Sequence, residues 1–305
     1  MEQHFLYELA KRYPQLKLPI EQDYQYSEIY RAAVNRGEDV GGTLDFSFSE
    51  EDTLETVSTP AGDIDVVTFA DRGDFEHALQ ALAYRCEPEW IPMTTGAMLI
   101  TGLINWEKIH RFRSKYILSG GKDWSGAFRE FTSVPENYRD SIILMSTGPY
   151  SNVPASAAAH LLQNGGDADG STAADADGCA PAADAETEKA WLEKSQIIRR
   201  THELTHFIVR KQHPGQKDVM RDEIVADAIG IIAAFGRYDA ALAERFLGIE
   251  GEEYWDEGRL ERCLDGMTLE NGMARAKLLI EEMEDLLMFM DTDNPWGVLA
   301  EIEGF

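Results

Sequence analysis

The pattern of apolar and polar positions divides the chain into two parts of different character. In the first part, the β-branched run at residues 66–70 (VVTFA) predicts a short strand, and apolar positions at helical spacing predict a helix over residues 74–85. Residues 141–147 (SIILMST) predict a second strand. The stretch 97–117 shows no strict alternation, and we assign it mostly to helix.

The second part is predicted to be helical over most of its length. Three runs carry apolar residues at helical spacing and end close to a glycine, a proline or a polar turn: residues 186–212, 221–235 and 269–290. Residues 164–187 are small and acidic and lack large apolar side chains, so they predict a solvated insert. The aspartates of this insert do not follow the ligand spacing of a calcium-binding loop.

These elements predict an α+β protein with a helix-rich core and a small mixed or antiparallel sheet. We expect an α+β portion over residues 1–92 and a helical metal-binding domain over residues 93–305, or one continuous domain across both. No internal repeat of solenoid period is present in the sequence.

Composition limits the partners and the compartment. Asp and Glu number 55 against 28 Lys and Arg, which gives a net charge of −27, so phosphate groups of nucleic acid or of a membrane surface would be repelled. The first 20 residues interrupt their apolar positions with charges and predict neither a signal peptide nor a spanning helix. The three cysteines are odd in number and lack CxxC spacing, which fits a reducing compartment. We therefore expect a cytoplasmic protein.

The strongest chemical signal lies in the helix predicted over residues 186–212, where His202, Glu203 and His206 form the pattern HELTH. At about 3.6 residues per turn, the two imidazoles point from one face about one turn apart, which suits two ligand positions of a tetrahedral zinc ion. Glu203 lies beside that face and can take a proton from water. A catalytic zinc needs a third protein ligand, so we expect one further along the chain.

Glu223 and Asp227, four residues apart in the next predicted helix, complete a pattern that resembles the gluzincin metallopeptidases, the thermolysin-like clan. The resemblance implies a zincin-like core that binds one zinc ion. It also implies that His202, His206 and Glu223 are the zinc ligands, that Glu203 is the general base, and that Asp227 orients the ring of His202.

The resemblance covers residues 202–227 and no other part of the chain. Small residues make the second helix of this motif thin, which favours close pairing of the two helices: Ala226, Ala228, Gly230, Ala233 and Ala234. Asp218 and Asp222 are rivals of Glu223 for the place of the third ligand, because one sequence does not fix the phase of a helix to within a residue.

Two features of the gluzincins have no unique counterpart. In that family an edge strand before the metal-binding helix holds the peptide substrate, and residues 141–147 could be that strand or an internal strand. A tyrosine or histidine also stabilises the tetrahedral intermediate. The sequence leaves several candidates for this group: Tyr238, Tyr150, His213, Arg221 and Tyr254.

Our hypothesis is a cytoplasmic, zinc-dependent metallopeptidase or related hydrolase acting on a peptide or small-molecule substrate, with neither nucleic acid nor membrane as partner. One alternative is a metal-binding interaction protein without catalysis. A second is a helical di-iron carboxylate oxidoreductase, in which Glu107 and His110 pair with Glu203 and His206. That site would need further glutamates, for which the sequence offers Glu223 and Glu281 or Glu284.

A last alternative gives the motif no metal. The histidines would then cap carbonyl groups, and Glu223 and Asp227 would form ordinary ion pairs with Arg199, Arg200 or Arg210.

Overall fold

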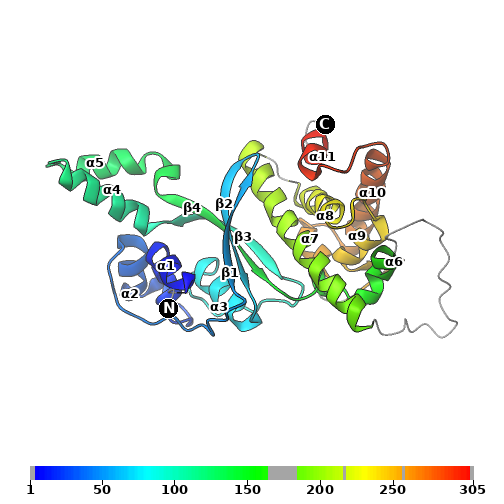
Figure 1. Cartoon of the computed structure of the whole chain (residues 1–305), viewed down its shortest axis with the longest axis horizontal. Coiled ribbons are helices and arrows are strands. Elements are labelled where there is room, and N and C mark those ends of the chain that lie inside the picture. Colours follow the sequence, from blue (N-terminus) through cyan, green and yellow to red (C-terminus); the bar gives the residue numbers. More distant parts are fainter. Residues whose placement is uncertain (1–3, 164–183, 216–217, 256–257, 303–305) are drawn as a thin grey trace. The chain divides into compact units, whose positions relative to one another are not determined.

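The computed structural model describes residues 4–163, 184–215, 218–255 and 258–302 (Figure 1). The chain packs as two compact units. Unit 1 comprises Met1–Ser58, Asp63–Ile91 and Met98–Ser146, and unit 2 comprises Thr59–Gly62, Pro92–Ala97 and Thr147–Phe305. The sequence analysis set the boundary at residue 92, whereas the packing places most of the next 54 residues in unit 1.

Unit 1 is built on a four-stranded mixed sheet of order β1-β2-β4-β3. Its strands are β1 (Thr53–Thr59), β2 (Gly62–Phe69), β3 (Ala97–Ile104) and β4 (Arg139–Ser146). β2 and β4 pair in parallel, with Val66 opposite Ile143. The strands predicted at residues 66–70 and 141–147 are confirmed. Of the two alternatives left open for residues 141–147, the structure shows the internal strand, because β4 lies between β2 and β3.

The core of unit 1 contains residues from the sheet and from the helices packed against it. The helical elements are α1 (Phe5–Arg12), η1 (Pro14–Lys17), η2 (Tyr24–Tyr26), α2 (Glu28–Tyr30), η3 (Arg31–Asn35), α3 (Arg72–Leu82), α4 (Trp106–Leu118), α5 (Trp124–Thr132) and η4 (Pro135–Asn137). Phe69 of β2, Phe75 and Leu79 of α3, and Leu144 of β4 are completely buried. α4 and α5 lie side by side and extend away from the sheet (Figure 1).

The helix predicted over residues 97–117 is only half correct. Its first half is the strand β3, and its second half is α4, which begins after Asn105 caps the helix by accepting a hydrogen bond from the Lys108 N–H. Gly102, with φ +76°, breaks the strand's alternation, since a residue with a side chain rarely adopts that backbone conformation. The strand therefore lacks the regular period by which the sequence would have revealed it.

Unit 2 is almost entirely helical in the residues that the structure describes. It contains η5 (Tyr150–Asn152), η6 (Ala155–Ala158), α6 (Ala159–Gln163), α7 (Ala185–Gln212), α8 (Val219–Phe235), α9 (Ala240–Leu247), the short pair β5 (Ile249–Glu250) and β6 (Glu253–Tyr254), η7 (Arg259–Cys263), α10 (Leu269–Leu287) and α11 (Pro295–Ile302). The three predicted helices of this part are confirmed as α7, α8 and α10, although α10 ends three residues early. Most of the predicted insert, residues 164–183, lies outside the described residues.

α7 and α8 pack against each other, and Gly230 of α8 lies at their contact. A Cβ atom built on Gly230 of α8 would lie 3.0 Å from both the carbonyl oxygen and the Cγ2 atom of Ile198 of α7. Ile198 is completely buried, as are Ala226 and Ala228 of α8. The thin second helix expected from the sequence is therefore what allows the two backbones to approach. No helix among the described residues combines the length and apolar character needed to cross a bilayer.

The close approach at Gly230 predicts a large cost for a β-branched side chain. We expect Gly230→Val to lower the free energy of unfolding by about 1–3 kcal/mol more than Ala233→Val, because valine at 230 must push the α7 backbone away. Ala233 is half-buried on the same helix and controls for the lower helix propensity of valine. Denaturant unfolding measures both. Equal midpoints for the two variants would contradict the close packing.

Cys86 and Cys263 are buried, and burial raises the pKa of each thiol to about 12. Since the thiolate is the reactive form, both should be inert at pH 8. In a Cys179→Ser variant, which leaves only these two, we expect a chromogenic thiol reagent to react in denaturant and not in native buffer. Reaction of the native variant faster than its unfolding would refute this.

Candidate metal centre

α7 and α8 present the three residues that form the candidate centre. Both histidines of the HELTH motif lie on the buried face of α7, with His202 5% and His206 8% exposed. α8 begins after Asp218, whose side chain accepts a hydrogen bond from the Arg221 N–H, and this start places Glu223 in the second turn. The side chain of Glu223 keeps 25% of its surface accessible, so the group is open on that side.

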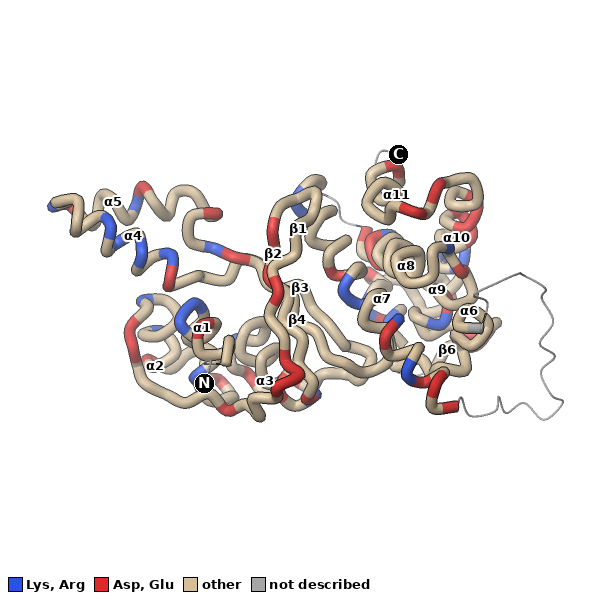
Figure 2. The backbone as a smooth tube through the Cα atoms, viewed as in Figure 1, with Lys and Arg blue, Asp and Glu red and all other residues tan. Residues whose placement is uncertain are grey.

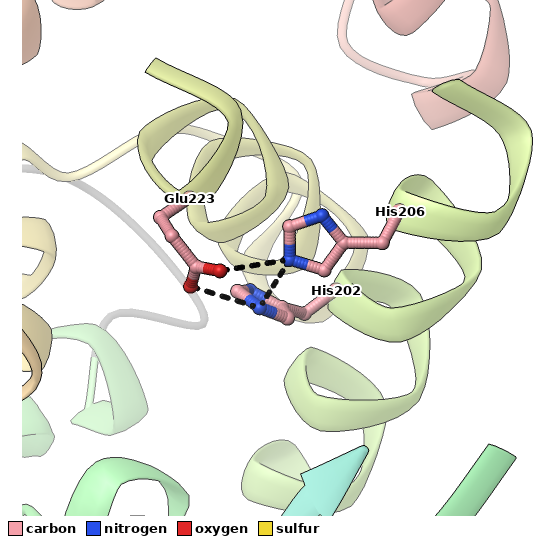
Figure 3. A group of neighbouring side chains, drawn as sticks. All are labelled: His202, His206 and Glu223. Carbon is pink, nitrogen blue, oxygen red and sulfur yellow. Dashed lines mark hydrogen bonds and ion pairs between the residues drawn. The ribbon is translucent and has the colours of Figure 1, made fainter. Parts of the chain in front are cut away.

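The ligand atoms of these three residues converge (Figure 3). The Nε2 atoms of His202 and His206 are 3.0 Å apart. The Oε1 atom of Glu223 lies 3.2 Å from His206 Nε2, and its Oε2 atom lies 3.4 Å from His202 Nε2. Zinc–ligand bonds of about 2.0–2.1 Å in a tetrahedral arrangement place ligand atoms about 3.3–3.4 Å apart. The three residues therefore fit a single small divalent ion.

The other ring nitrogen of His202, Nδ1, contacts a carboxylate and a tyrosine hydroxyl. His202 Nδ1 lies 2.9 Å from the Oδ1 atom of Asp227, which is 1% exposed. The Tyr150 hydroxyl lies 2.9 Å from the same nitrogen and donates to the same carboxylate oxygen at 2.6 Å. With its Nδ1–H donated to Asp227, the ring directs Nε2 toward His206 and Glu223, and in the neutral ring this nitrogen carries the lone pair that can bind a metal ion.

Arg259 of η7 joins both carboxylates, and the sequence analysis did not identify it. Its Nη2 donates to Glu223 Oε2 at 2.6 Å, and its Nη1 donates to Asp227 Oδ1 at 3.1 Å and to the Tyr150 hydroxyl at 2.8 Å. It is 7% exposed. The alternative without a metal expected ion pairs of Glu223 and Asp227 with other arginines. Both carboxylates do form ion pairs, but with Arg259, and the ligand atoms of His202, His206 and Glu223 converge at the same time.

Charge compensation determines how these buried groups titrate. Burial would raise the pKa of Glu223, yet His206 and His202 hold it well below its usual value. Burial likewise acts to raise the pKa of Asp227, which Arg259 and His202 lower. For His202, burial acts to lower the pKa, but the hydrogen bonds with Asp227 and Glu223 raise it to about 9. The two carboxylates therefore favour positive charge nearby, and a divalent ion would supply it.

The other predicted site residues take different places. Glu203 is 8% exposed on α7, next to His202. The Tyr150 hydroxyl contacts the Nδ1 side of His202, away from the converging ligand atoms. The Tyr238 hydroxyl is buried without a hydrogen-bond partner among the described residues, and burial, followed by Asp227, raises its pKa. His213 is the exposed C-cap residue of α7.

Several rival residues are engaged elsewhere. Asp218 pairs with Arg275, and the Tyr254 hydroxyl donates to the carbonyl of Gly258. Glu107, which the di-iron alternative requires, forms ion pairs with Arg12 and Arg111 in unit 1. Within the described residues, the only group of three metal-ligating side chains is His202, His206 and Glu223.

The chain belongs to a protein family described as "Family of unknown function (DUF7005)", whose model matches residues 2–164 and 178–294. The match includes every residue of the candidate centre. A search of curated proteins found no match, and a search of solved structures found none.

Removing the charge of Arg259 should leave two buried carboxylates without their shared partner. We expect Arg259→Met to lower the free energy of unfolding of the metal-free protein by about 3–5 kcal/mol. Glu223→Gln in the same background should recover part of this loss, since it removes one of the uncompensated charges. Denaturant unfolding in the presence of a chelator measures each variant and gives the coupling energy.

Arg259→Lys is the conservative control, because it retains the charge but not the two-pronged contact. It should be less harmful than Arg259→Met. If Arg259→Met and Glu223→Gln have strictly additive effects, the ion pair does not stabilise the centre.

Proposed function

We propose that this member of the DUF7005 family is a metal-dependent hydrolase that binds one divalent ion, in the first instance zinc, through His202, His206 and Glu223. The observation that carries the proposal is the convergence of ligand atoms from the three residues. The two Nε2 atoms lie 3.0 Å apart, Oε1 of Glu223 lies 3.2 Å from His206 Nε2, and its Oε2 lies 3.4 Å from His202 Nε2. The contact of His202 Nδ1 with Asp227 supports it, because this contact directs Nε2 toward the other two ligand residues.

When bound, the ion would supply a Lewis acid that polarises a carbonyl oxygen and makes water more acidic. The remaining chemistry belongs to the side chains. Glu203 accepts the proton of the attacking water on its carboxylate and returns it to the leaving group. Asp227 and Tyr150 hold the ring of His202, and Arg259 holds Oε2 of Glu223, which leaves Oε1 to serve as the single ligand atom.

We propose a peptide or related amide as the substrate class, on the strength of the resemblance of residues 202–227 to the gluzincin peptidases. The partial exposure of Glu223 supports a catalytic centre over a closed structural one, because a catalytic ion must admit water and substrate. Tyr150 is better assigned to positioning His202 than to stabilising the tetrahedral intermediate, since its hydroxyl contacts Nδ1.

Metal analysis tests the binding part of the proposal. Protein purified without chelator or nickel resin should contain about one equivalent of zinc per chain. His206→Ala and Glu223→Ala should lose it, because each removes a ligand. Glu107→Ala and His110→Ala are matched controls from the second ExxH sequence and should retain it. Full metal content in Glu223→Ala would refute this ligand set, and loss of iron from the control variants would favour the di-iron alternative.

Glu203→Gln tests the catalytic part. The substitution keeps the shape of the side chain and removes its basicity, so we expect unchanged zinc content and a cleavage rate about 10²–10⁴-fold lower. Cleavage of a mixture of unstructured peptides, followed by mass spectrometry, measures the rate. Glu193→Gln, an exposed substitution on the same helix, is the control. A zinc-loaded wild type without turnover would instead indicate a binding role, and equal rates for wild type and Glu203→Gln would exclude Glu203 as the base.

A further inference from the structure

The end of the hairpin formed by α4 and α5 carries exposed apolar side chains next to basic ones. We call this surface the hairpin tip and define it by Arg113, Lys115, Ile117, Leu118 and Lys122. Ile117 is 59% and Leu118 87% exposed. Such adjacent exposed aliphatic side chains are costly in water unless another surface covers them.

Unit 1 itself does not cover the hairpin tip. The buried residues of α4 are Trp106 and Ile109, both at its beginning, and α5 has no buried residue. The aromatic rings of the hairpin are engaged with one another: Phe112 stacks on Phe131 with ring centroids 4.1 Å apart, and Trp124 packs near Phe112. The rings therefore hold the hairpin together, while the two aliphatic side chains remain unpartnered.

The hairpin has the opposite charge to the rest of the chain. Residues 106–133 contain six Lys or Arg and three Asp or Glu, whereas the whole chain has about twice as many acidic as basic residues (Figure 2). Arg113, Lys115 and Lys122 form no ion pair with any residue that the structure describes, although Arg113 lies over the ring of Trp124 at 5.5 Å. The hairpin tip is thus an apolar surface with free positive charge.

Unit 2 carries a surface of complementary character where α10 ends. We call it the α10 end and define it by the apolar Met288 and Phe289 and the carboxylates of Glu281, Asp285 and Asp291. Phe289 is 89% and Met288 65% exposed. The three carboxylates are exposed and form no ion pair with a described residue. Residues 281–293 contain no Lys or Arg.

We propose that the hairpin tip of one copy of this protein binds the α10 end of another copy. Leu118 and Phe289 are the two most exposed large apolar side chains among the described residues, and they lie on surfaces of opposite charge. Tip-to-tip and end-to-end contacts would bring like charges together, which excludes a symmetric contact through either surface alone. The contact is therefore head-to-tail, and it closes into a ring or extends as a chain.

The chemistry favours a protein surface over other occupants of the hairpin tip. Nucleic acid would use aromatic rings for stacking, but those of the hairpin already stack on one another. An anionic lipid surface would attract the tip and repel a chain of net charge −27. The α10 end offers negative charge together with apolar side chains. Both surfaces are small, so the association should be weak, dependent on concentration and weakened by salt.

Sedimentation velocity of the full chain over a range of protein concentrations tests the proposal. Wild type should exceed the 34.2 kDa monomer at high concentration, and less so in high salt. Lys115→Glu with Lys122→Glu, or Glu281→Lys with Asp285→Lys, should each leave the protein monomeric. An equimolar mixture of these two double variants should associate again, because each then offers a surface that complements the other. Leu118→Ser and Phe289→Ser should each weaken association at least about tenfold.

Lys11→Glu with Arg36→Glu makes the same change in net charge as the Lys115→Glu, Lys122→Glu variant, on exposed positions outside the hairpin, and should leave association unchanged. Circular dichroism verifies that each variant is folded. The proposal is overturned if wild type remains monomeric at every concentration, if the double variants associate as wild type does, or if mixing them restores nothing. It is equally overturned if monomeric wild type co-floats with vesicles containing phosphatidylserine and the tip variants do not.

Discussion

The position of two carboxylates one turn apart on α8, Asp227 fully buried and Glu223 partly buried, is the constraint on which unit 2 depends. Glu223 and Asp227 lie on a helix that is otherwise almost wholly apolar, and burying an uncompensated carboxylate would oppose folding. Imidazoles from α7 and a guanidinium from η7 supply the compensation. The packing of α7 and η7 against α8 is therefore an electrostatic requirement as much as a hydrophobic one.

The two carboxylates are held in different ways, and the difference separates their roles. Asp227 is 1% exposed, and its Oδ1 atom accepts hydrogen bonds from an imidazole, a phenol and a guanidinium. Such a group is fixed in place and can only orient its neighbours. Glu223 faces both Nε2 atoms and keeps a quarter of its side-chain surface accessible. It is the carboxylate that can exchange a protein contact for a ligand from solution.

Sequence reasoning succeeded where the chemistry is local and failed where it depends on tertiary neighbours. The helices α7 and α8 and the shared face of His202 and His206 follow from helical spacing, because residues four apart share a face whatever the surrounding fold. The place of Glu223 beside them was expected only from the resemblance to the gluzincins, and the structure brings its carboxylate to the two rings. Arg259 lies 32 residues after Asp227 in a short 3₁₀ helix, and no periodicity distinguishes it from a surface arginine. Likewise, the composition of β4 fitted both an edge and an internal strand, and only the pairing with β2 and β3 decides between them.

Arg259 also explains how ion pairs and a metal ligand set can coexist on the same residues. A carboxylate has two oxygens, and at Glu223 the guanidinium binds Oε2 while Oε1 lies nearest His206. If Arg259 were absent, both oxygens would be free to bind one ion, and the extra ligand atom would occupy a position that water needs. If the centre binds the ion proposed above, Arg259 would hold Oε2 and leave Oε1 as the ligand atom. The ion pair of Arg259 with Glu223 is therefore compatible with the proposed metal centre, because it occupies one carboxylate oxygen and not both.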